Sequence, residues 1–124
     1  MSVLFVFLSM IFCHVIADYN LQGWLASAKQ KDYWEQITPK ELYKYDYIMA
    51  LIMHSISWTF MIMLPIAYVR KFNIGIMFLI VFIGNVIIHS IVDHMKANEK
   101  IINLWQDQFM HMIQIGITFA LLCI

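Results

Sequence analysis

Charged residues interrupt this chain at only a few places, and the intervals between them are long and apolar. Four stretches contain no Asp, Glu, Lys or Arg: residues 1–17, 47–69, 72–92 and 108–124. Uncharged apolar runs of about this length are typical of helices that cross a bilayer. The pattern predicts four helices, over about residues 2–28, 39–68, 72–96 and 101–124.

Short connections join the predicted helices. Residues 29–37 form a polar connection, and residues 97–100 suffice only for a turn. The second helix begins near Thr38, which can cap it, with Pro39 in the first turn and Glu41 at the capping-box position. The sequence therefore predicts an all-α fold class: a single integral membrane domain over residues 1–124, built as an up-down-up-down four-helix bundle with one polar site between the helices.

Composition narrows the class of protein further. Hydrophobic residues make up 62% of the 124 residues and charged residues only 13%, which departs strongly from a soluble domain. Eight basic and eight acidic side chains cancel, so the chain has no basic field for nucleic acid. Cys13 and Cys123 lie in apolar stretches and do not make a disulfide framework. We expect membrane lipid as a partner and no nucleic acid.

Histidine and aspartate recur at helical spacing inside the apolar segments. Three predicted helices carry a His/Asp pair four residues apart, and the second carries a single histidine: His14 and Asp18, His89 and Asp93, Asp107 and His111, and His54. A spacing of four puts both side chains of a pair on one helix face. At a rise of ~1.5 Å per residue, all seven fall in one layer of the membrane. Three carboxylates in one layer repel each other unless they are protonated or neutralised.

Imidazole and carboxylate groups are ligands that zinc, iron and manganese accept. We therefore predict that these seven residues bind one or two divalent metal ions, zinc first, with iron or manganese as alternatives. The three aspartates, Asp18, Asp93 and Asp107, are also the predicted catalytic acid–base groups. Four more polar residues are expected to orient ligands or to hold a headgroup: Gln22, Asn85, Lys96 and Gln108. A His/Asp network or proton relay without metal is the alternative.

Three motifs follow one another along the chain: HxxxDxxxQ from His14 to Gln22, HxxxDxxK from His89 to Lys96, and DQxxH from Asp107 to His111. With His54, they make the chain resemble a family of small four-helix integral membrane proteins of bacteria and phages, known as a domain of unknown function. The resemblance implies no established activity. It implies a location in the bacterial cytoplasmic (inner) membrane. Ceramidase-like and adiponectin-receptor-like membrane hydrolases also gather His, Asp and Ser from several helices, which is a chemical analogy.

The residues favour a metal-dependent intramembrane hydrolase that acts on a lipid or lipid-like amphiphile entering between helices. The alternative is a metal-ion or proton transporter or channel subunit using the same His/Asp cluster, because intramembrane ionisable groups also mark ion pathways. Few ligands extend towards the opposite membrane face, which argues against transport. A structural or lytic role would leave the buried carboxylates unexplained. A homodimer is a further possibility, because four short helices enclose little volume.

Overall fold

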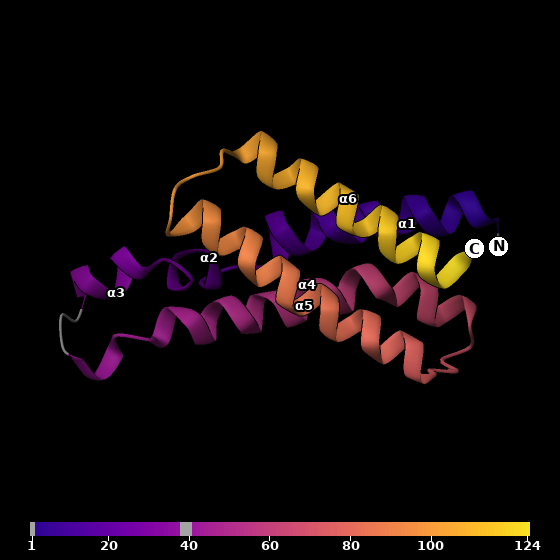
Figure 1. The fold of residues 1–124 in the computed structure, drawn as a ribbon, viewed down its shortest axis with the longest axis horizontal. Helices are drawn as coiled ribbons and strands as arrows, with labels where there is room; N and C mark the ends of the chain where they lie inside the picture. Colours follow the sequence, from indigo (N-terminus) through magenta and orange to yellow (C-terminus); the bar gives the residue numbers. More distant parts are fainter. Residues whose placement is uncertain (1, 38–40) are drawn as a thin grey trace.

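The computed structural model describes residues 2–37 and 41–124, and every regular element within these ranges is helical, which confirms the all-α prediction. Four helices are long: α1 (Val3–Ile16), α4 (Asp46–Val69), α5 (Ile76–Ala97) and α6 (Leu104–Cys123). Helix α1 packs against α4 and α6, and α5 packs against the same two helices. Both chain ends lie at one end of the molecule, and the α5–α6 connection lies at the other with α3 (Lys31–Ile37) (Figure 1).

Three segments among the described residues are long and apolar enough to cross a membrane: Val3–Leu21, Glu41–Val69 and Ile76–Ala97. Helix α6 is not one of them, because polar side chains such as Asp107 and Gln108 occupy its first turns. Large apolar side chains are exposed on the outside of the molecule, including Phe12, Ile80 and Phe109. An outer surface of this kind suits lipid rather than water. The structure thus indicates a membrane-associated helical protein.

The first predicted helix, over residues 2–28, is interrupted in the structure. Helix α1 ends at Ile16 and continues as one π-helical turn over Ala17–Leu21. Gly23 then adopts a φ of +53°, in the left-handed region that ends helices and favours glycine. The short helix α2 (Leu25–Ala28) follows, and α3 lies inside the stretch predicted as a polar connection. Prediction of a single helix to residue 28 was therefore wrong, and the reason is the backbone conformation at Gly23.

The third and fourth long helices begin later than predicted, at Ile76 and Leu104 rather than at residues 72 and 101. Lys71 and Phe72 have φ values of 51° and 59°, which belong to the turn after α4. Asn103 caps α6 in a capping box, in which the Asn103 side chain accepts from the backbone N–H three residues on. Local turn and cap chemistry therefore sets both starts.

The predicted start of the second helix at Thr38 and Pro39 lies outside the described residues. The described chain resumes with a 3₁₀ turn over Glu41–Tyr43, and α4 follows from Asp46. Helix α4 stays helical through Pro65 to Val69.

The apolar core lies between the four long helices and ends against the polar site. Met10, Trp58, Ile62 and Ile115 are fully buried and belong to one hydrophobic cluster. Trp58 lies at the edge of this cluster, one turn after His54 on α4. The core therefore closes the polar site on one side and fixes the faces of α1, α4, α5 and α6 that bear its side chains.

Candidate functional site

Five of the seven predicted ligands come together between the helices. Two groups have ligand atoms within 4.8 Å of one another: Asp18, His54 and His89, and His89, Asp93 and His111. Their side chains come from the π-helical turn after α1 and from α4, α5 and α6. The three histidines are at most 2% exposed. Such a cluster of imidazole and carboxylate atoms could hold a metal ion.

The spacing of the ligand atoms fits a small metal ion. His54 Nε2 lies 3.2 Å from His89 Nε2, 3.4 Å from Asp18 Oδ1 and 3.3 Å from Asp93 Oδ2. His111 Nε2 lies 3.2 Å from Asp93 Oδ1, and His89 Nε2 lies 3.6 Å from the same oxygen. Around a tetrahedral zinc ion with bonds of about 2.0–2.1 Å, ligand atoms are roughly 3.3–3.4 Å apart. The three ligand atoms of each group could therefore hold a divalent ion, and in the structure the same atoms pair with one another as hydrogen bonds and ion pairs.

His89 limits how many ions the cluster can hold. The Nε2 atom of His89 faces both His54 Nε2 and Asp93 Oδ1, so one nitrogen serves both groups. An imidazole nitrogen has one lone pair and binds one metal ion. The two groups are thus alternative positions for a single ion as long as His89 is a ligand. Of the one or two ions that the sequence allowed, the geometry favours one.

His14 lies beside the cluster, but both of its ring nitrogens are already engaged. Trp58 Nε1–H donates to His14 Nδ1 at 2.8 Å, so this nitrogen carries no proton. The other nitrogen, Nε2, then bears the proton of the neutral ring and donates to Gln108 Oε1 at 3.0 Å. His14 Nδ1 lies 3.7 Å from Asp18 Oδ2. His14 belongs to neither ligand group, and its hydrogen bond orients Gln108.

Asp107 also lies outside both groups, next to His111. Its Oδ2 accepts from Gln108 Nε2 at 2.9 Å and from Lys96 Nζ at 3.2 Å. Its Oδ1 lies 3.4 Å from His111 Nε2 and has no hydrogen-bond donor among the described residues. Gln108 Nε2 also donates to Asp18 Oδ2 at 3.3 Å. Gln108 therefore links both aspartates to His14, and the other oxygen of Asp107 faces His111.

Stacked rings hold two of the histidines. The Trp58 and His89 ring centroids are 4.1 Å apart with planes 18° from parallel, and those of His89 and His111 are 4.2 Å apart at 27°. Trp58 is fully buried, so this stack has little freedom to turn. The Nδ1 atoms of His89 and His111 have no hydrogen-bond partner among the described residues. The rings therefore present Nε2, rather than Nδ1, to Asp93.

Sequence reasoning missed Lys29, which reaches into the site from the end of α2. Its Nζ donates to Asp93 Oδ2 at 2.7 Å, and the lysine side chain is only 12% exposed. Asn98, at the end of α5, fixes the backbone here by donating to Lys29 O at 2.9 Å and accepting from Lys31 N at 2.6 Å. The left-handed Gly23 redirects the chain so that α2 packs on α4. This glycine inside an expected helix was the signal that could have revealed the fold-back.

A polar mouth borders the cluster on the side of α2 and the α5–α6 connection. It is a cavity of about 100 Å³ lined by Gln22, Lys29, Lys96 and Gln108, together with the three site aspartates. Gln22 Nε2 donates to the backbone oxygen of Asp18 at 2.7 Å, so Gln22 lies at the mouth and not on a ligand. Lys29 and Lys96 give the mouth two cations.

Asn85 does not orient a site histidine, contrary to the role expected for it. Asn85 Nδ2 donates to Thr118 Oγ1, and Gln114 Nε2 donates to Asn85 Oδ1, both at 2.8 Å. These three residues make a separate network, one to two turns deeper along α5 and α6 than His89 and His111.

Comparison of the chain with models of known protein families finds no match. Curated proteins and solved structures likewise give no match to it. The family resemblance drawn from the motifs therefore stays a prediction, and what this site does must be argued from its geometry.

Proposed function

We propose that the protein is an integral membrane four-helix bundle, up-down-up-down, of the bacterial cytoplasmic membrane. Three segments have the length and hydropathy of membrane spans. The fourth crossing would be α6, whose 20 residues correspond to about 30 Å of helix and therefore match the hydrocarbon core. The polar face of α6 is turned into the cluster: Asp107 and His111 are each at most 1% exposed. An internal polar face of this kind is compatible with a lipid-facing exterior.

We further propose that the His/Asp cluster holds one divalent metal ion, zinc first and iron or manganese as alternatives. His54 and His89 would be ligands with Asp18 in one position, and His89 and His111 would be ligands with Asp93 in the alternative position. The observation that carries this proposal is the convergence of three Nε2 atoms and two carboxylates at 3.2–3.6 Å. The three site aspartates and Lys29 and Lys96 together leave one net negative charge, which a divalent ion would more than neutralise.

The function supported best is hydrolysis of an ester or amide bond in a lipid-like amphiphile. When bound, a divalent ion supplies a Lewis acid that makes water nucleophilic near neutral pH. Asp107 is the proposed proton acceptor, because Lys96 and Gln108 hold its Oδ2 while its Oδ1 has no hydrogen-bond donor among the described residues. Lys29 and Lys96 at the mouth would attract an anionic headgroup. The core behind Trp58 excludes water from the other side.

Elemental analysis of the purified protein tests the metal site. The expected result is about one equivalent of zinc, iron or manganese, because His89 Nε2 cannot serve two ions. His89→Ala removes the ligand shared by both groups and should abolish binding. His94→Ala is the matched control, since His94 lies on the same helix but is partly exposed and pairs with Glu99 at 3.1 Å. Folded wild-type protein with no metal after growth in metal-supplemented medium would overturn the metal proposal.

Asp107→Asn separates hydrolysis from metal binding. The substitution keeps the size of the side chain and leaves both ligand groups intact, so metal content should persist while turnover is lost. The assay would follow release of fatty acid from a panel of ester- and amide-linked single-chain amphiphiles in nanodiscs. Full metal loading without turnover of any of them in the wild type would overturn the hydrolase proposal and leave the metal site standing.

A further inference from the structure

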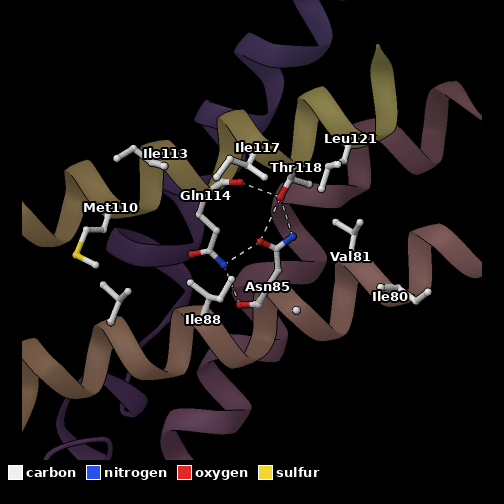
Figure 2. Close-up of a pocket in the computed structure, with 12 residues that line it drawn as sticks. Ile80, Val81, Asn85, Ile88, Met110, Ile113, Gln114, Ile117, Thr118 and Leu121 are labelled. Atoms are coloured by element: carbon white, nitrogen blue, oxygen red, sulfur yellow. Dashed lines mark hydrogen bonds between the residues drawn. The ribbon is translucent and has the colours of Figure 1, made fainter.

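An apolar groove lies between α5 and α6 (Figure 2), and its lining shares no residue with that of the polar mouth. Its volume is about 390 Å³, within the range of small-molecule pockets. The rim consists of aliphatic side chains that are about half exposed: Ile80, Ile88, Ile113, Ile117 and Leu121. In a membrane-spanning chain, this rim faces hydrocarbon. The groove is therefore accessible to lipid from the side.

Three polar side chains lie beneath the groove, whose exposed lining is almost entirely apolar. They are Asn85, Gln114 and Thr118, and each is at most 5% exposed. The NH₂ group of Gln114 donates two hydrogen bonds to Asn85, one to its backbone oxygen and one to Oδ1, at 2.8 Å each. Gln114 Oε1 has no donor among the described residues and points away from Asn85 along the groove (Figure 2). A buried carbonyl without a donor is costly in an apolar environment.

The length of the groove matches a hydrocarbon chain from one leaflet. Its lining extends from Ile80 to Val92 on α5, which is about 18 Å at ~1.5 Å per residue. Half of a ~30 Å hydrocarbon core is about 15 Å. One extended acyl chain lying along the helices would therefore fill the groove from end to end.

We propose that this groove binds one hydrocarbon chain of a membrane amphiphile, and that an N–H or O–H near the amphiphile's head donates to Gln114 Oε1. Met110 marks the end of the groove nearest the site, and Gln114 lies one turn, about 6 Å, further in. A donor close to the junction of head and tail would reach this depth. The class of ligand is accordingly an N-acylated or hydroxylated single-chain amphiphile.

The groove ends at the level of the His/Asp cluster. Val92 and Met110 line this end, and their neighbours in sequence are Asp93 and His111. An amphiphile whose hydrocarbon chain lies in the groove would have its head at the depth of the polar mouth. The assignment of this ligand as the substrate rests on the proposed hydrolase function, whereas the binding itself does not.

Two glycines allow a matched test of the groove. Gly84 lines the groove and Gly116 lies on α6 outside its lining, and an added Cβ meets nothing within 4 Å at either position. Gly84→Leu should therefore fold and fill the groove, while Gly116→Leu adds the same side chain elsewhere on the lipid-facing surface. Ile117→Phe is a second groove-filling variant, because Ile117 is a 55%-exposed rim residue.

The probe is an N-acyl amphiphile that carries a diazirine midway along its chain, photolysed with the protein in nanodiscs and mapped by mass spectrometry. We expect wild-type adducts on groove residues of α5 and α6, loss of these adducts in Gly84→Leu and Ile117→Phe, and their retention in Gly116→Leu. Adducts scattered over all exposed helices, or groove adducts unchanged by both filling variants, would overturn the proposal. So would a second copy of the chain cross-linked across the groove in place of lipid.

Two further measurements separate this proposal from the function of the site. The control probe is an ester-linked amphiphile of equal length, which lacks the N–H donor. Gln114→Leu should reduce labelling by the amide probe to the level of this ester probe. Equal labelling of the wild type by both probes would overturn the role of Gln114. Metal content measured in the same preparations should be unchanged in Gly84→Leu. Groove labelling that persists in metal-free His89→Ala would show that the groove binds lipid independently of the metal site. The metal proposal is tested separately by elemental analysis.

Discussion

Replacing Lys29 by methionine tests whether a buried ion pair holds the site together. Lys29 Nζ lies 2.7 Å from Asp93 Oδ2, and the two side chains are 12% and 4% exposed. Methionine keeps most of the length and apolar surface of the lysine but removes its charge. Asp93 would then be left with a buried charge and only histidine neighbours, of which His54 Nε2 is 3.3 Å from the same oxygen.

The expected cost follows from the burial of the pair. Removing one partner of a buried ion pair costs on the order of 3–5 kcal/mol of folding free energy. We expect the lower end, about 3 kcal/mol, because Lys29 keeps some exposure and the histidines can share the charge of Asp93. Adding Asp93→Asn to Lys29→Met should recover most of this loss, since the uncompensated charge then disappears.

The free energy of unfolding would be measured by SDS titration in detergent micelles, with chelator present so that no metal replaces the lysine. Lys31→Met is the matched control, because Lys31 is exposed two residues away. Equal destabilisation by Lys29→Met and Lys31→Met, or no recovery in the double variant, would refute the buried-pair argument. Added zinc should narrow the gap between Lys29→Met and wild type, because the ion supplies positive charge beside Asp93.

Three further predictions concern single contacts. Trp58→Phe removes the donor to His14 Nδ1 and should cost about 2 kcal/mol of unfolding free energy while changing the imidazole ¹⁵N shifts of His14; unchanged shifts would contradict the assigned tautomer. Gly23→Ala should cost about 1–2 kcal/mol through its +53° φ alone, because the site of the added Cβ is open, so a stabilised variant would contradict this account. Lys100 lowers the pKa of exposed Asp32, so the stabilisation by this pair is present at neutral pH and is lost as pH falls through that lowered pKa. Asp32→Asn should therefore make the free energy of unfolding less dependent on pH in the acid range. An unchanged pH dependence would show that the pair contributes nothing.

Much of the fold could be predicted because the absence of charge over long stretches has one main physical solution. Apolar runs with buried backbone groups form helices: α4 follows the uncharged stretch 47–69 closely, and α5 overlaps most of the stretch 72–92. Helix ends depend instead on single residues. Gly23 could serve in a helix or in a left-handed turn, and only packing of α2 against α4 decides between them. Hydropathy carries no information about that choice.

The sequence predicted five residues of the two ligand groups, but it did not predict how they contact one another. Four-residue spacing places His89 beside Asp93 and Asp107 beside His111 whatever the neighbouring helices do. Which nitrogen faces which oxygen depends on helix rotation and on rings such as Trp58, and the sequence does not encode these in any simple period. Lys29 was missed for a related reason, since a lysine at the end of an apolar run ordinarily reaches towards water.

The depth of the polar side chains bears on the choice between a resident site and an ion pathway. Among the described residues, the buried polar side chains that lie beyond the histidines are neutral: Thr59, Asn85, Gln114 and Thr118. Amides and hydroxyls do not exchange protons as a His/Asp chain does, and the buried residues further along are apolar: Ile66, Phe78, Val81 and Leu122. The proposed metal ion would therefore leave by the mouth beside Lys29 through which it enters, which favours the proposed resident site over an ion pathway. Zinc or proton flux into proteoliposomes above that of the His89→Ala variant would contradict this argument and favour a transporter.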